Sequence, residues 1–300
     1  MVLADNYVGN IYLEDKTIKG RVIKGVAGKF TVLVDDVEYK AFARGKLKND
    51  GEIRVGDMVE IESNRSYVIE KVYPRQNSLI RPYVANIDMA IITIAESPKP
   101  DFVLVDKILI NCKQSNIKPI LCVNKMDILS KELKQSIETD YKGIVDIYYV
   151  SAHTKQGILE LEKLIENKVV CFCGQSAVGK SSIINCLLED RTLEVGGLSK
   201  KTERGKHTTR VTEIIKVAGG YVVDTCGFSM LENIDINEKD LALYYPEFYE
   251  PSYYCKYRGC NHIHEPECEV KKLVEDGTIS RSRYDRYIQI YEQIKETRRK

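Results

Sequence analysis

The segment GQSAVGKS at residues 174–181 restricts the fold of this chain more than any other. It has the form G-x-x-x-x-G-K-[S/T], with the apolar run VVCFC before it and SIINCLLE after it. Glycines in such a loop let backbone N–H groups surround phosphates, and the helix that follows adds the positive end of its dipole. A strand, a phosphate-binding loop and a helix in this order predict a nucleotide-binding α/β domain.

The loop supplies the first set of candidate nucleotide contacts. Lys180 is expected to reach the β- and γ-phosphates and to act in catalysis, and the Ser181 hydroxyl is expected to bind Mg²⁺. The other candidate contacts of the loop are Gly174, Gln175, Ser176, Ala177, Val178, Gly179 and Ser182. The alternative is a glycine-containing turn without a ligand, which the flanking strand and helix make the weaker interpretation.

A second phosphate-sensing motif, DTCG at residues 224–227, ends the apolar strand YVVDT. Asp224 at the strand end can hold Mg²⁺ through a water molecule, and the Gly227 N–H can meet the γ-phosphate. The D-x-x-G pattern is weak alone. Its position downstream of a phosphate loop and at a strand end makes it good evidence.

The motif NKMD at residues 124–127 predicts which base is bound. Asp127 can accept hydrogen bonds from the guanine N1–H and exocyclic amine, whereas adenine offers neither donor. The Lys125 stem can lie over the base, and Asn124 can connect this loop to the phosphate loop. These side chains follow the strand KPILCV, at the sheet edge where ligands of open α/β sheets bind.

The motif SAHT at residues 151–154 ends the next strand and supports guanine specificity. Ser151 belongs to the candidate base-binding set, and the Ala152 N–H is placed to meet the guanine O6. Either base motif alone could be an ordinary strand-end loop. Both motifs at successive strand ends, followed by a phosphate loop, predict a GTP/GDP site.

The order of the motifs is unusual. Small GTPases run from the phosphate loop through the switch and D-x-x-G to N-K-x-D and S-A, but here N-K-x-D and S-A come first. A circular permutation of this kind preserves the sheet if the original termini lie near each other. It also makes the switch elements lead directly into the C-terminal part of the chain.

Three cysteines and a histidine near the C-terminus form a candidate metal site. The pattern is Cys255-x4-Cys260-x-His262-x5-Cys268, and three thiolates with one imidazole suit a tetrahedral, structural Zn²⁺ without an open position. His264 is the competing ligand, although a surface histidine is the better interpretation of that residue. We expect one zinc per chain, holding a loop-rich module together.

Together these features predict an α/β multidomain protein, and its 300 residues leave room for two or three modules. The GTPase domain should be a mostly parallel sheet with helices on both faces, because apolar strands alternate with helical segments. Five short alternating strands before it fit a small oligonucleotide-binding (OB) barrel. The predicted divisions are the barrel at 1–72, a linker at 73–83, the permuted GTPase domain at 84–230 and a mainly helical zinc-binding domain at 231–300.

The permuted order, the preceding barrel and the Cys/His module resemble the RsgA family, also called YjeQ or YloQ, along essentially the whole chain. The resemblance implies a GTPase that binds the small (30S) ribosomal subunit through its rRNA late in subunit maturation and is stimulated by it. It supports the Cys, Cys, His, Cys ligand set. It also assigns water activation to His207, which could instead be an exposed loop residue that faces RNA.

The hydrolysis residues deviate from those of many GTPases. Phe228 follows DTCG where many GTPases place a water-orienting Gln, so another group must orient the water. Thr208 or Thr209, in the segment GKHTT, could close on Mg²⁺ and the γ-phosphate. Without a built-in Gln, we expect slow basal hydrolysis that depends on a partner.

Charge and composition exclude little. The net charge of +1 predicts no partner, although the last twenty residues carry seven basic and three acidic side chains. Such a run suits a polyanion, and a solvated surface is the commoner explanation. Without an apolar run of about 18 residues or a secretion signal, we expect a cytoplasmic protein that does not bind membranes. We also expect a monomer.

Two other functions stay open at this stage. The chain could be a nucleotide-gated placeholder on RNA or the ribosome with negligible hydrolysis, which Phe228 favours. It could also be a GTPase that delivers or senses zinc, but a closed four-ligand site argues against transfer of the metal.

Overall fold

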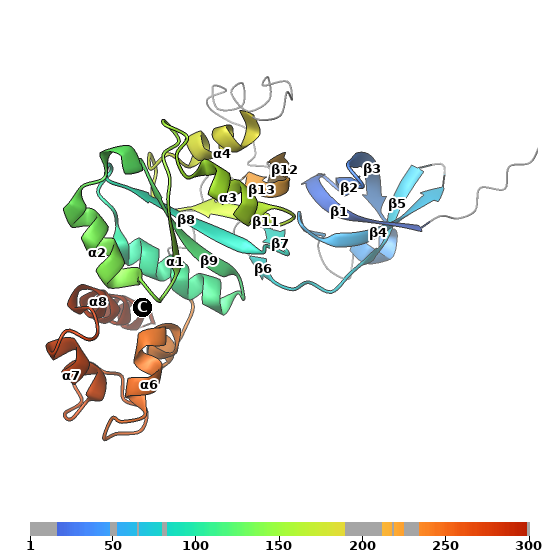
Figure 1. Cartoon of the computed structure of the whole chain (residues 1–300). Helices are drawn as coiled ribbons and strands as arrows, with labels where there is room; N and C mark the ends of the chain where they lie inside the picture. The colour runs from blue at the N-terminus through green and yellow to red at the C-terminus, as the bar shows by residue number, and fades with distance from the viewer. Residues whose placement is uncertain are drawn as a thin grey trace, which may run out of the picture. The chain divides into compact units, whose positions relative to one another are not determined.

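Figure 1 shows the computed structural model of the chain, which forms two compact units, Met1–Arg75 and Gln76–Lys300. The structure describes residues 17–48, 53–64, 66–79, 83–189, 212–217, 219–224 and 234–298.

The first unit is a closed five-stranded barrel. Its strands are β1 (Thr17–Val26), β2 (Lys29–Val34), β3 (Val37–Ala43), β4 (Met58–Asn64) and β5 (Ser66–Val72). They run in the order β1-β2-β3-β5-β4, and β1 pairs with β4 as well, which closes the ring. A bulge between Val22 and Lys24 bends β1 from one partner to the other. Side chains of alternating residues, such as Val32, Ile61 and Ile69, fill the barrel, and the predicted barrel is confirmed.

The described residues of the second unit include a six-stranded sheet. Its strands are β8 (Met89–Ala95), β9 (Lys118–Asn124), β10 (Asp146–Tyr149), β11 (Val169–Cys173), β12 (Glu213–Val217) and β13 (Gly220–Asp224). Within this unit they run in the order β10-β9-β8-β11-β13-β12, and only the β13–β12 pair is antiparallel. Two short strands, β6 (Ser78–Leu79) and β7 (Val84–Ala85), pair with each other ahead of the sheet. β8 and β11 are buried along their whole length, as strands covered on both faces must be.

Helices cover both faces of this sheet (Figure 1). They are α1 (Phe102–Gln114), α2 (Lys131–Tyr141), α3 (Ile158–Ile165) and α4 (Lys180–Glu189), with a short 3₁₀ turn, η2 (Met126–Ile128). On one face, Leu161 of α3 and Ile183 of α4 join a single core with Ile91 of β8. Within the described segments, no helix combines the length and apolar character needed to cross a lipid bilayer.

The C-terminal part of the second unit is mainly helical. Its elements are η4 (Glu238–Tyr244), η5 (Pro246–Phe248), α6 (Tyr249–Ser252), α7 (Glu269–Glu275) and α8 (Arg281–Arg298). Aromatic rings form its core: Tyr287 meets Tyr245 and Phe248 edge to face, with ring centres 5.0 Å apart in both pairs. Ile110 of α1 belongs to the same core, so this helical part packs against α1, one of the helices that cover the sheet.

Candidate active site and metal centre

The predicted nucleotide motifs meet at the carboxyl edge of the parallel strands. β9 ends at Asn124, β10 is followed by Ser151, β11 ends at Cys173 just before the phosphate loop, and β13 ends at Asp224. Because parallel strands point the same way, motifs that are far apart in the sequence come together at this edge.

The phosphate loop has a backbone that only glycine can adopt at two positions. Gly174 has φ +115°, and a Cβ there would lie 2.2 Å from the Thr93 carbonyl oxygen. Gly179 has φ +96°, and a Cβ there would lie 2.2 Å from the Asn124 side-chain nitrogen. The sequence glycines are therefore required by close packing as well as by backbone conformation.

Lys180 lies over the loop. Its Nζ donates hydrogen bonds to the carbonyl oxygens of Gly174 (2.8 Å) and Gln175 (2.5 Å). Partial burial lowers the pKa of this ammonium group, while Cys173 opposes the shift. These hydrogen bonds keep the positive charge of Lys180 at the phosphate loop, where a bound phosphate group would form an ion pair with it.

Asn124 joins three of the motifs. It is 2% exposed; its Nδ2 donates to the Val178 carbonyl at 2.9 Å, and its Oδ1 accepts from the Ala152 N–H at 3.2 Å. One amide side chain therefore fixes the phosphate loop and the SAHT loop against the end of β9. In this structure, the Ala152 N–H that we predicted to meet guanine O6 is used in that contact.

The two residues assigned to the base lie beside Asn124. Lys125 adopts a left-handed backbone (φ 60°), and its Nζ donates to the carbonyls of Ser97 (2.6 Å) and Ala177 (3.2 Å). Asp127 is exposed, and a hydrogen bond with the Ser151 side chain lowers the pKa of its carboxyl group. An ionised carboxylate that faces solvent is available to accept hydrogen bonds from a ligand.

Part of the predicted hydrolysis site lies outside the described residues. The predicted site residues that lie outside them are His207, Thr208, Thr209, Gly227 and Phe228. Asp224 is placed by its backbone, which pairs with Glu213 at the end of β13.

The segment between β8 and α1 also belongs to this edge, although no sequence motif indicated it. Gln175 Oε1 accepts from the Asp101 N–H at 2.8 Å, and Gln175 Nε2 donates to the Lys99 carbonyl at 3.2 Å. Both partners follow the carboxyl end of β8, the position where ligand-site loops occur in such sheets. That position is the signal that could have identified them.

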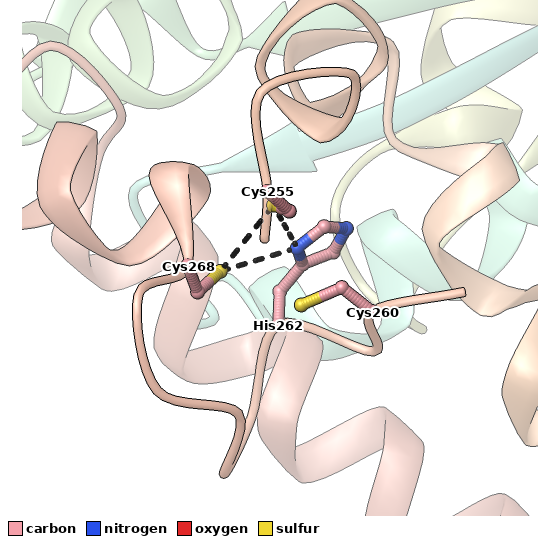
Figure 2. A group of neighbouring side chains, drawn as sticks. All are labelled: Cys255, Cys260, His262 and Cys268. Carbon is pink, nitrogen blue, oxygen red and sulfur yellow. Dashed lines mark hydrogen bonds between the residues drawn. The ribbon is translucent and has the colours of Figure 1, made fainter. Parts of the chain in front are cut away.

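The four predicted metal ligands come together in the C-terminal part (Figure 2). Their donor atoms all lie within 4.8 Å of one another. Cys255 Sγ is 3.9 Å from Cys268 Sγ, and His262 Nδ1 is 3.7 Å from Cys255 Sγ and 3.3 Å from Cys268 Sγ. A tetrahedral zinc with bonds of about 2.3 Å to sulfur and 2.0 Å to nitrogen would separate its ligand atoms by about 3.5–3.8 Å. The donor set and its spacing therefore fit the ion.

A neighbouring serine fixes the tautomer of the histidine ligand. The Ser252 hydroxyl donates to the Phe248 carbonyl at 2.5 Å, so its lone pair can accept the Nε2–H of His262 at 3.1 Å. This assigns the proton to Nε2 and leaves the Nδ1 lone pair facing the thiols, as a metal ligand requires. Burial lowers the pKa of His262, which favours the neutral ring.

His264 is not part of the cluster. Its side chain is exposed, and its backbone N–H donates to Glu265 Oε2 at 3.1 Å. Glu265 accepts two further backbone hydrogen bonds, from Asn261 at 2.9 Å and Ile263 at 3.0 Å. These bonds fold the loop around the carboxylate so that His262 points inward and His264 outward.

The remaining described cysteines differ from the cluster. Cys112, Cys122, Cys171 and Cys173 are buried and Cys186 is half-buried. Burial raises the pKa of Cys112 and of Cys122 to about 12, so these thiols stay protonated. This agrees with packing roles, and Cys226 lies outside the described residues.

The Ser252 contact gives a first prediction. In Ser252→Ala, His262 Nε2 loses its hydrogen-bond acceptor, so the ring is less firmly held in the ligand tautomer. We expect the affinity for Zn²⁺ to fall about tenfold, the lower end of the range for such outer contacts. Competition with a chromophoric chelator measures it, with Ser282→Ala as the matched serine control. Equal affinity in Ser252→Ala and the unmodified chain would contradict this role.

Comparison with known proteins places the chain in a family. A family model described as RsgA GTPase matches residues 72–234, more than half of the chain, and a second, described as RsgA N-terminal domain, matches residues 19–67. The chain belongs to the RsgA GTPase family. The resemblance inferred from the motif order is thereby confirmed.

Relatives in the RsgA family match nearly end to end. A protein of Agathobacter rectalis named small ribosomal subunit biogenesis GTPase RsgA is 40% identical over 295 residues, covering 92% of this chain and 98% of that protein. A Bacillus cereus protein of the same name is 40% identical over 288 residues and covers 93% and 98% of the two chains.

Solved structures of RsgA-type proteins share the fold. The crystal structure of YjeQ from Thermotoga maritima has a TM-score of 0.81 at 33% identity and covers 93% of this chain and 99% of that one. The structure of YloQ, described as a circularly permuted GTPase, has a TM-score of 0.79 at 31% identity, covering 96% and 99%. The predicted fold class, including the permutation, is confirmed.

Proposed function

We propose that the chain hydrolyses GTP to GDP and phosphate while bound to the small ribosomal subunit. The observation that carries the nucleotide part is Asn124, whose amide joins the phosphate loop to the SAHT loop at 2.9 and 3.2 Å. Asp127, ionised and exposed, lies beside that junction. This arrangement supports phosphate binding and guanine reading at one sheet edge, and the family supports hydrolysis.

The residue roles follow from their chemistry. Lys180 and the loop N–H groups bind the phosphates, Asp127 reads the base, and Ser181 with Asp224 would hold Mg²⁺, which supplies charge neutralisation at the β- and γ-phosphates. His207 is proposed to orient the attacking water, because Phe228 cannot form a hydrogen bond to it. Thr208 or Thr209 is proposed to close over the γ-phosphate, and Gly227 to contact it.

The partner is proposed from the relatives. They are named small ribosomal subunit biogenesis GTPases, and this chain matches them over 92% or more of its length. We propose that the barrel and the C-terminal part contact rRNA, that hydrolysis releases the protein late in maturation, and that it acts as a monomer in the cytoplasm. The Cys255, Cys260, His262 and Cys268 cluster is proposed to hold one structural Zn²⁺.

Turnover measurements test this function. We expect slow GTP hydrolysis by the purified chain, an increase of about tenfold or more on addition of small ribosomal subunits, and no hydrolysis of ATP. Large ribosomal subunits serve as the matched control. GTP binding without any stimulated hydrolysis would favour the placeholder function, for which Phe228 is the supporting feature. Equal use of ATP would contradict guanine specificity.

A further inference from the structure

Helix α1 begins beside the phosphate loop. Gln175 Oε1 accepts from the Asp101 N–H at 2.8 Å, and Gln175 Nε2 donates to the Lys99 carbonyl at 3.2 Å. The Asp101 side chain in turn accepts from the Leu104 N–H at 3.0 Å and caps the helix. One side chain of the phosphate loop is therefore bonded to the backbone at the start of α1.

The base-binding loop contacts the same segment. Lys125 Nζ donates to the Ser97 carbonyl at 2.6 Å and to the Ala177 carbonyl at 3.2 Å. Residues 97–101 are thus hydrogen-bonded to side chains of both nucleotide loops. These residues therefore contact the predicted nucleotide site and lead directly into α1.

Asp106, in the second turn of α1, is the centre of a buried ionic cluster. It is 1% exposed and accepts from Arg283 Nη1 (2.6 Å), Arg286 Nε (2.7 Å) and the Tyr141 hydroxyl (2.8 Å). Arg283 and Arg286 belong to α8, at the far end of the chain. A buried carboxylate must keep such partners, because an unpaired charge in the interior is strongly unfavourable. The cluster therefore fixes α1 against α8.

More contacts extend along the same helix. Ile110 lies in the C-terminal core, and Lys113 Nζ donates to the Leu243 carbonyl at 2.6 Å. Asp106 is five residues beyond Asp101, which is about 7.5 Å along a helix axis. The arginine cluster and the phosphate-loop contact are therefore separated by less than two turns of one rigid element.

We infer that Asp106 and Arg286 are positioning residues for the phosphate loop, acting through α1 and Gln175. A displacement of α8 moves α1, and α1 moves the groups that hold the Gln175 side chain. A partner that binds the C-terminal part would then alter nucleotide affinity, and nucleotide would alter the binding of that partner by the same factor. This inference rests on the proposed function, because it assumes that the loop binds a guanine nucleotide.

Two matched carboxylates test it. Asp140, on α2, is 2% exposed and accepts from Arg286 Nη1 at 3.0 Å, but it lies outside α1. We expect Asp106→Asn to weaken binding of a fluorescent GDP analogue about tenfold, and Asp140→Asn to change it less than about twofold. Both substitutions should lower thermal stability. Equal GDP affinities in the two variants would overturn the inference.

A double substitution locates the path. Gln175→Ala removes the contact between the loop and α1, so Asp106→Asn should have no further effect on GDP affinity in that background. Non-additive losses support transmission through Gln175. Losses that multiply would show that Asp106 acts independently of the loop and would overturn the proposed path.

Hydrogen exchange tests the inference without Asp106→Asn, in case that variant does not fold. In the unmodified chain, GDP should increase amide protection in α1 and α8. In Gln175→Ala, at a GDP concentration raised until the site is filled, the increase in α8 should be absent. Unchanged protection of α8 in the unmodified chain would overturn the inference with the proposed function intact. Absence of GDP binding by the unmodified chain would instead contradict the proposed function.

Discussion

Asp127→Asn is expected to transfer the nucleotide preference from GTP to xanthosine triphosphate. The Asp127 carboxylate can accept from both the N1–H and the exocyclic amine of guanine, and its lowered pKa keeps it ionised. An asparagine places an NH₂ group opposite the guanine amine, so two donors face each other. Xanthine has a carbonyl oxygen at that position and accepts the new donor. We expect GTP affinity to fall at least about a hundredfold, because a polar mismatch in a base site leaves a group unpaired.

Equilibrium binding of fluorescent guanosine and xanthosine nucleotides measures the change of preference. Asp146→Asn is the matched control, since Asp146 is exposed and forms a surface ion pair with Lys118 at 2.9 Å. Surface pairs of this kind contribute little, so the control should keep the affinity of the unmodified chain for GTP. If Asp127→Asn lost both nucleotides equally, Asp127 would have a structural role and another group would read the base.

The sheet was predictable because its signals are local. Apolar runs such as Met89–Ala95 and Val169–Cys173 are typical of strands covered on both faces, and motifs that follow parallel strands lie together at the carboxyl edge of the sheet. The order of the motifs then fixed the permutation. The alternating strands of the barrel were predictable for the same reason, since a period of two residues determines which side chains face inward.

The buried arginines of α8 were not predictable. The basic residues at 281–300 suggested a polyanion-binding or solvated surface, yet Arg283 and Arg286 are buried against Asp106. Nothing near them in the sequence indicates this, because Asp106 lies about 180 residues earlier. A buried ion pair depends on which helices pack together, and that information is in the tertiary structure.

The outer contacts of the two sites were missed for a related reason. Ser252 holds His262 from a four-residue helix, and Gln175 bonds to backbone groups of a loop after another strand. Serine and glutamine occur throughout surfaces, so their identity predicts no partner. Only the directly binding residues have a recognisable spacing.

Removal of the metal is expected to unfold the C-terminal part of the chain. Cys268 is buried in its hydrophobic cluster, Cys255 and Cys260 pack against that cluster, and the loop that carries them has no strand between α6 and α7. Zinc binding to comparable small sites contributes about 10–16 kcal/mol at pH 7, which is as large as the whole stability of a domain, about 5–15 kcal/mol. Elemental analysis should find one zinc per chain. When the protein is heated with a strong chelator, the unfolding signal that comes from the C-terminal helices, α8 included, should be absent.

Substitution of a ligand gives the matched comparison. Cys268→Ser removes one of the three thiolates, and we expect it to lose stoichiometric zinc and the stability that accompanies it. Cys186→Ser changes a half-buried thiol outside the cluster and should keep one zinc per chain. A fully folded C-terminal part in metal-free protein would contradict a structural metal, and zinc that leaves on nucleotide exchange would favour the metal-handling function.

The metal affinity should also depend on pH in a direction that the thiols determine. Burial raises the pKa of Cys260 to about 12 and raises that of Cys268, so both thiols are protonated at neutral pH without metal. Binding displaces these two protons, and an excess of protons therefore favours release. Zinc affinity should fall by at least about a hundredfold for each pH unit below neutrality, a factor of ten for each of these two protons, because the site has three thiolate ligands. Burial lowers the pKa of His262, so the ring is neutral near pH 7 and adds no proton there. Chelator competition at pH 6, 7 and 8 measures the slope, and an affinity independent of pH would mean that these thiols are not the ligands.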